Sequence, residues 1–389
     1  MIKAITASTF EIDDGNRAVE DILSQLEFDN KVLRKHSIGI LSCYAEFIES
    51  GVVRMLSEAL PFDIIGTTTI ACGTPQASGE TVLSIMVLTS DDVEFSTSLS
   101  EPVYEEDEAV FATMYEAAST KLSGKPKLLL SFVPLLTTVG SDFYVDCMTK
   151  ISGNVPNFGT LAVDHNQDYH ESRVILNAES WPDRYAILLM SGNVEPAFFI
   201  GTISDDKVFP EKGAVTASKG NQLQAIDGKP AVEYLLSLGL EKNAEGTITG
   251  INSFPIVVDY NDGTTPVVRA MFAITPEGHV VCGGNIPVGS TISMGSFDPE
   301  EIKATTIAAI QTAIEKCPNA SYLIYSCIGR FFAQGFDQAA EMNAGNAVLN
   351  TAENAFLAAY SGGELCPVYT TGGSTMNRNH NNSFVICAI

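Results

Sequence analysis

Basic side chains are scarce in this chain of 389 residues, which has 22 Lys and Arg residues against 47 Asp and Glu and a formal net charge of −25. Nucleic acid and anionic membranes would be repelled at long range, so neither is an expected partner. Long apolar runs are also lacking: the longest, residues 128–139, is too short to span a bilayer and contains Pro134. We therefore expect a soluble protein.

Paired metal-ligand motifs are absent as well. The eight cysteines form no CxxC pair and no signal peptide precedes them, so we expect reduced thiols in a cytoplasmic protein. The five histidines show no HxH or HxxxH spacing. One polar loop places two of them close to carboxylates, and it contains Asp164, His165, Asp168 and His170. A solvated loop is the favoured interpretation, a metal or haem site is the alternative, and no metal or other cofactor is expected.

Apolar residues make up 45% of the chain, enough for a packed interior, and the length exceeds what one core usually supports. Helix, strand, helix, strand and apolar hairpin follow one another in residues 1–100 and again in 101–205. Ser42 maps onto Ser131 (131 − 42 = 89) and Gly66 onto Gly159 (159 − 66 = 93), which indicates an internal duplication. The final third uses the unit again. We predict an α/β fold with mixed sheets built from repeated α-β-α-β-hairpin units in two packed halves.

Periodicity predicts the individual elements. Helices are expected over 17–26, with Ala18, Ile22 and Leu26 on the apolar face, and over 44–60, 104–122, 141–153, 230–238 and 299–316, the last with Asp298 as its N-cap. Strands are expected over 2–7, 37–42, 62–68, 127–133, 155–163, 322–326, 356–360 and 383–389. Three hairpins are expected, joining 80–90 to 93–99, 184–192 to 194–202, and 267–275 to 279–285. Residues 209–260 form a different segment between the second and third copies.

Residues 321–367 collect polar side chains where strands end. One apolar run stops at Ser326-Cys327, with Arg330 close behind, and a second breaks on Gly362-Gly363 beside Glu364. Ligands bind at that end of open α/β sheets. A guanidinium suits a carboxylate and Glu364 suits an ammonium group, so together they match an amino acid. The alternative is that Arg330 and Glu364 bridge each other and tie two strand ends together.

Two further readings of strand-end residues stay open. Cys327, His380 and Glu364 have the types of a nucleophile, a base and an orienting group, although a strand-end cysteine is more often a small buried hydrophobe. Glycines at strand ends, as in Gly66-Thr67 and at Gly159, permit the close approach of a ligand or of a neighbouring backbone. A ligand site would then include both threonine-flanked glycines.

Several segments resemble the FIST family (F-box and intracellular signal transduction). Residues 198–240 look like the junction and start of its C-terminal half. SCIGR, GGEL and HNNSFVI are similar to its Cys-x-x-Arg, Gly-Glu and His-Asn-x-Thr elements, with Ser383 in place of Thr. IIGTTT and VPNFGTLAVD are similar to its N-terminal motifs, although Ile70-Ala71 replaces a Gly-Glu pair. The resemblance implies a FIST N-terminal domain over 1–205 and a FIST C-terminal domain over 206–389.

The resemblance also implies a function. It indicates a bacterial, cytoplasmic, non-enzymatic sensory protein of signal transduction that binds amino acids or related small zwitterions. The ligand-binding residues that it implies, together with the strand-end pattern, are Cys327, Arg330, Glu364, His380, Asn381, Gly66, Thr67 and Gly159. No output domain is expected, so the signal would pass to a separate protein, and a homodimer is compatible with the sequence. The rival functions are a Cys327-dependent enzyme and a haem-based nitric-oxide sensor.

Overall fold

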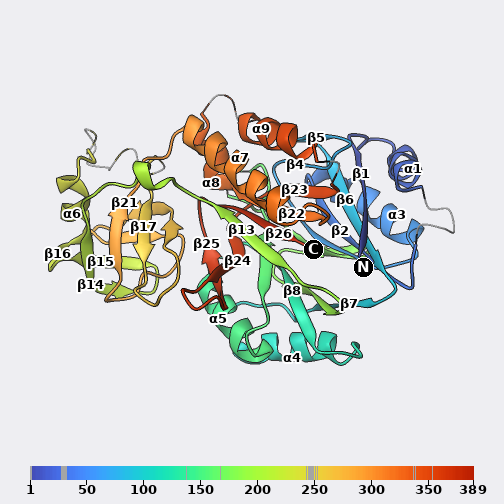
Figure 1. Cartoon of the computed structure of the whole chain (residues 1–389), viewed down its shortest axis with the longest axis horizontal. Helices are drawn as coiled ribbons and strands as arrows, with labels where there is room; N and C mark the ends of the chain where they lie inside the picture. The colour runs from blue at the N-terminus through green and yellow to red at the C-terminus, as the bar shows by residue number, and fades with distance from the viewer. Residues whose placement is uncertain are drawn as a thin grey trace.

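Three six-stranded sheets form the larger part of the molecule, and corresponding strands follow the same order in each of them. A fourth sheet lies at one end of the long axis of the molecule (Figure 1). The computed structural model describes residues 2–27, 33–136, 138–166, 168–241, 243, 249, 251, 253–335, 337, 339–352 and 354–389. Each of the three sheets centres on one parallel strand pair from one repeat unit. No helix in the described part of the chain combines the length and apolarity needed to cross a membrane.

The first unit follows the predicted order. Its elements are β1 (Lys3–Thr9), α1 (Gly15–Leu26), β2 (His36–Cys43), α2 (Glu46–Glu49), α3 (Val52–Ala59), β3 (Ile64–Thr68), β4 (Cys72–Gly73), β5 (Ser78–Gly79) and β6 (Leu83–Ser90). The Asp14 side chain caps α1, which buries the predicted stripe Ala18, Ile22 and Leu26. The single helix predicted over 44–60 is wrong, because Gly51 adopts a left-handed conformation (φ 83°) that separates α2 from α3.

The second and third units repeat this plan. The second unit comprises β7 (Val93–Leu99), α4 (Glu108–Ser119), β8 (Pro126–Val133), α5 (Ser141–Ser152), β9 (Asn157–Leu161), β10 (Val174–Leu176), β11 (Glu179–Trp181) and β12 (Ala186–Gly192). The third comprises β13 (Ala197–Gly201), α7 (Pro299–Lys316), β22 (Tyr322–Cys327), α8 (Ile328–Ala333), α9 (Ala340–Leu349), β23 (Phe356–Ser361), β24 (Glu364–Tyr369), β25 (Thr375–His380) and β26 (Phe384–Ala388). As predicted, Asp298 caps α7 ahead of Pro299.

Each unit lends a hairpin to another unit's sheet. The strand orders are β1-β6-β2-β3-β10-β11 in the first sheet, β7-β12-β8-β9-β24-β25 in the second and β13-β26-β22-β23-β4-β5 in the third. The hairpin β10–β11 of the second unit thus completes the first sheet, β24–β25 of the third unit completes the second, and β4–β5 of the first unit completes the third. The exchange closes into a ring of three.

The inserted sheet interrupts the third unit between β13 and α7. The inserted segment begins with η1 (Asp205–Lys207) and continues with β14 (Gly213–Lys219), β15 (Gln222–Ile226), β16 (Lys229–Pro230), α6 (Ala231–Ser237), β17 (Ile256–Asp259), β18 (Val267–Arg269), β19 (Met271–Ile274), β20 (Val280–Cys282) and β21 (Thr291–Met294). Its apolar residues form a core of their own. The predicted hairpin over 267–285 is confirmed for β19 and β20, but it belongs to this insertion and not to a third repeat.

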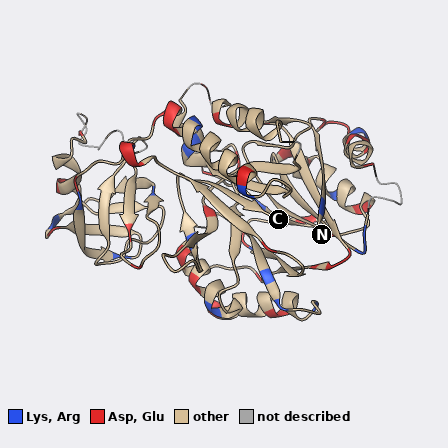
Figure 2. Cartoon of the chain, in the orientation of Figure 1, with Lys and Arg blue, Asp and Glu red and all other residues tan. Residues whose placement is uncertain are grey.

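The three repeat sheets share one central core, which includes Ile40, Leu130 and Tyr325, one residue from the middle of each sheet. Separate apolar layers join the outer face of each sheet to its helices. The predicted α/β class with mixed sheets of repeated units is therefore confirmed. Acidic residues are spread over the helices and loops of the molecule (Figure 2). The predicted domain limits, 1–205 and 206–389, stay predictions.

Two of the predicted hairpins are wrong. β6 pairs with β1 and β2, whereas β7 pairs with β12, so the turn at Asp91-Asp92 carries the chain from one sheet to the next. β12 and β13 likewise belong to different sheets. A tight turn between two apolar strands looks the same in sequence whether the strands pair or part. The landmark Ser42 also needs correction, because Gly66 pairs with Leu41, as Gly159 pairs with Ser131.

Candidate functional site

Most of the predicted ligand-binding residues lie where the parallel strands of the third unit end. Cys327 ends β22 and precedes α8, which carries Arg330, while Glu364 begins β24. Glu364 pairs with His380 across β24 and β25, and Asn381 follows at the end of β25. Directly opposed residues project from the same face of a sheet, so Glu364 and His380 are neighbours.

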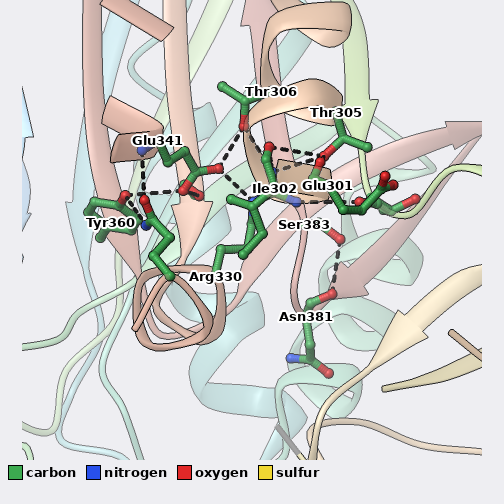
Figure 3. A network of polar contacts seen from close by, with 12 residues as sticks. Glu301, Ile302, Thr305, Thr306, Arg330, Glu341, Tyr360, Asn381 and Ser383 are labelled. Carbon is green, nitrogen blue, oxygen red and sulfur yellow. Dashed lines mark hydrogen bonds and ion pairs between the residues drawn. The ribbon is translucent and has the colours of Figure 1, made fainter. Parts of the chain in front are cut away.

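Arg330 is fully buried and its guanidinium is held by protein groups (Figure 3). Its nitrogens donate to Glu341 Oε1 (2.6 Å), the Ile302 carbonyl (2.8 Å), Thr305 Oγ1 (3.1 Å), Thr306 Oγ1 (2.8 Å) and the Thr202 carbonyl (3.4 Å). Its ionic partner is Glu341, so the alternative ion pair between Arg330 and Glu364 is wrong. This network fastens α7, α8 and α9 to one another.

Glu341 is the residue that sequence reasoning missed. Its Oε1 also accepts from Thr306 Oγ1 (2.7 Å), and its Oε2 accepts from Ser326 Oγ (2.9 Å) and Tyr360 Oη (3.1 Å). The available signal was helical spacing, since Glu341, Gly345 and Leu349 form the buried stripe of α9. A carboxylate on such a stripe requires a buried cationic partner.

Glu364 has the opposite environment. It is fully buried, and neither carboxylate oxygen has a hydrogen-bond partner among the described residues. Burial raises the pKa of this carboxyl well above its usual range, and the nearby Arg330 guanidinium and Cys327 thiol offset only part of the effect. The Cys327 thiol pKa is raised too, first by burial and then by Glu364. A protonated thiol is a poor nucleophile, so this geometry does not favour the Cys327 enzyme.

His380 is buried and neutral. Its Nε2 donates to the Cys366 carbonyl at 2.9 Å, which leaves the Nδ1 lone pair without a partner in the described residues. Burial lowers the His380 pKa to about 3. Asn381 Oδ1 is also unpartnered, and its side chain points away from the Arg330 network in Figure 3. Among the described residues, two hydrogen-bond acceptors at this end of β25 therefore lack a donor: His380 Nδ1 and Asn381 Oδ1.

Of the N-terminal candidates, Gly66 and Thr67 lie in the first sheet, whereas Gly159 lies in the second sheet beside Glu364 and His380, where it pairs with Leu365 of β24. An ideal Cβ would come within 1.8 Å of the Leu41 carbonyl oxygen at Gly66 and within 2.2 Å of the Ser131 carbonyl oxygen at Gly159. Close approach of a neighbouring strand thus accounts for both glycines. Thr67 follows in β3, one residue before that strand ends, and is buried.

A groove of about 690 Å³, here called the inner groove, lies between the inserted sheet and the repeat units. Its apolar wall includes Phe198, Ile200 and Val268. Its polar lining includes Asp205, Lys212, Asp259, Thr291, Ser293 and His380. The volume lies within the usual range for small-molecule sites, and side chains of both charge signs line it. Of the predicted ligand-binding residues, His380 lines this groove.

The polar loop with two histidines does not gather around a common point. His170 Nδ1 lies 2.7 Å from Asp168, whereas His165 stacks on Tyr44 and its Nε2 lies 3.8 Å from Glu46. Within the described residues, no group of three or more His, Cys, Asp or Glu side chains has a geometry that could hold a metal ion.

Family models match most of the chain: the FIST N domain over residues 37–229 and the FIST C domain over 231–367. No curated protein matches. Among solved structures, a cyanuric acid hydrolase from A. caulinodans is 8% identical, with a TM-score of 0.41, over 100% of this chain and 98% of that one. A second cyanuric acid hydrolase is 10% identical, with a TM-score of 0.37 and the same coverage. Likeness at this level carries no functional argument.

Proposed function

The chain belongs to the FIST family, whose domains are associated with sensory roles in signal transduction, and on that premise we propose that it senses a small zwitterionic ligand, such as an amino acid, bound in the inner groove. The observation that carries this proposal is the lining of the groove. Lys212 offers an ammonium group to a ligand carboxylate, and Asp205 and Asp259 offer carboxylates to a ligand ammonium group. His380 also lines the groove, and its unpartnered Nδ1 is buried behind the groove surface.

We further place Glu364, Cys327 and Asn381 behind His380 as the buried layer that senses occupancy. Glu364 lies directly opposite His380 in the β24–β25 pair, so a ligand that shifts the imidazole also changes the surroundings of this unpartnered carboxyl. All eight cysteines are unpaired thiols, which supports a cytoplasmic location. The signal would then pass to a separate protein.

The test is thermal unfolding of the purified protein with each common amino acid at millimolar concentration. A ligand at about 100 times its dissociation constant adds about 2.7 kcal/mol and raises Tm by a few degrees. Lys212→Ala should remove most of that shift. Lys219→Ala is the matched control, because Lys219 is also an exposed lysine at β14 but does not line the groove. Equal shifts in both variants, or no shift with any amino acid, would contradict the proposal.

A further inference from the structure

The strand β13 has an open edge. In the described part of the sheet it pairs only with β26, and it stands at the end of the third sheet. The Phe198 N–H donates to the Tyr369 hydroxyl at 3.4 Å, so it points away from β26. Residues two apart in an antiparallel pair direct their N–H and C=O groups the same way, so Ile200 also faces this edge. The edge thus offers backbone hydrogen-bonding groups to an incoming chain.

Both faces of this edge are hollow. The inner groove lies along one side of this edge, and Phe198 and Ile200 line both it and a second groove. This second groove of about 550 Å³, here called the outer groove, lies between β13 and α7 and is lined by Thr305, Ala309 and Lys316, among others. A strand that adds to a sheet projects successive side chains to opposite faces. At β13, the side chains on one face of an added strand would enter the inner groove, and those on the other face would enter the outer groove.

The charges at the two ends of the edge have opposite signs. Gly201 lies against Thr305 of α7, and the helix runs on to Lys316, which lines the outer groove. Figure 1 shows α7 and β13 running in opposite directions, so Lys316 marks the Ala197 end of β13. Asp205 lies beyond the other end. The helix from Thr305 to Lys316 spans about 16 Å, the length of about five residues of extended strand.

We propose that the ligand of this protein is a short peptide of about five residues, which adds to β13 as an antiparallel strand. Its terminal carboxylate lies near Lys316 and its terminal ammonium group near Asp205. Its backbone replaces the Tyr369 hydroxyl as the partner of the Phe198 N–H. This inference rests on the proposed sensing function and narrows its ligand class, because a peptide fills both grooves whereas a single amino acid occupies part of one.

The experiment is calorimetric titration of the full chain with Ala-Leu-Ala-Leu-Ala and two N-methylated isomers, one methylated at residues 3 and 5 and one at residues 2 and 4. In an added strand one set of N–H groups faces β13 and the other faces away. One isomer should therefore bind about tenfold more weakly than the parent, while the other keeps its affinity. Each isomer is the matched control for the other. No binding of the parent, or equal effects of the two methylation patterns, would overturn the inference.

The peptide ends provide a second readout. Lys316→Gln should weaken the free peptide about two- to fivefold and leave the C-terminally amidated peptide unaffected. Equal weakening of both forms would contradict the assigned direction. Free alanine and free leucine are titrated in parallel. If they bind and the peptide does not, the sensing proposal stands and the peptide inference falls; if none of them binds, both fall.

Discussion

The Glu364 side chain is a buried carboxyl that folding keeps protonated. Its pKa in the folded protein is raised, so the folded state holds a proton that the unfolded state releases above a pH of about 4.3. Its contribution to stability is therefore fully present at low pH and is lost as the pH rises towards the folded-state pKa. A ligand that supplied a hydrogen-bond donor to this carboxylate would reverse part of that loss.

Glu364→Gln should remove this pH dependence. As the pH rises from about 4.3 towards the folded-state pKa of Glu364, the free energy of unfolding of the native protein should fall relative to the variant, by up to about 1.4 kcal/mol per pH unit. Urea unfolding at four pH values measures the difference. Glu341→Gln is the matched control, because it also replaces a buried glutamate by glutamine. It leaves the buried Arg330 without its ionic partner, so the variant should lose about 3 to 5 kcal/mol of stability. A constant difference between the native protein and Glu364→Gln would show that the carboxyl is ionised.

The sequence located this cluster but not its pairings. A strand end followed by Cys327 and Arg330, and another followed by Glu364, sufficed to bring these residues to one region, because parallel strands end at the same edge of a sheet. The partner of Arg330 depended on how α9 packs, and Glu341 lies on that helix 11 residues away (341 − 330 = 11). No local pattern specifies such a tertiary contact.

At the scale of elements, each of the first two sheets has a parallel strand pair whose two strands approach each other unusually closely at one glycine. Gly66→Ala would place a Cβ 1.8 Å from the Leu41 carbonyl oxygen, and Gly159→Ala would place one 2.2 Å from the Ser131 carbonyl oxygen. Each strand would have to move, so we expect each variant to lose at least about 3 kcal/mol of stability. Chemical unfolding measures the loss.

The control for these glycines is Gly124→Ala. Its Cβ would meet nothing closer than Ser191 at 3.7 Å, and the change should stay within about 0.5 kcal/mol. If Gly66→Ala were equally mild, the strands would have room to separate, and a ligand role for this glycine would regain support.

The elements themselves were largely predictable, and their pairing was not. Amphipathic spacing located α1, the capping residue Asp298 with Pro299 located α7, and apolar runs located β2, β8 and β22. The lent hairpins β4–β5 and β10–β11 were missed, because strands of two or three residues carry almost no periodic signal. Their partners also come from another unit, which a reading of local order cannot reveal.

At the scale of the whole molecule, the exchanged hairpins make the two predicted domains depend on each other. Residues 1–205 lack β24–β25, which completes the second sheet, and residues 206–389 lack both β13 and β4–β5 of the third. We expect each fragment to aggregate when expressed alone, because it exposes an apolar strand edge. Coexpression should give a soluble complex of one copy of each fragment, measured by light scattering after gel filtration. A folded, monomeric 206–389 fragment would contradict this.

The ring of lent hairpins also bears on ancestry. A single unit would hold one hairpin that it cannot use and one gap that it cannot fill, so it could complete its sheet only with a hairpin from another copy. Fusion of three copies of one short gene would produce this arrangement. In the first two units, residues 10–14 and 100–107 join the first strand directly to its helix. The inserted sheet is therefore a feature of the third unit alone, and it supplies one wall of the inner groove.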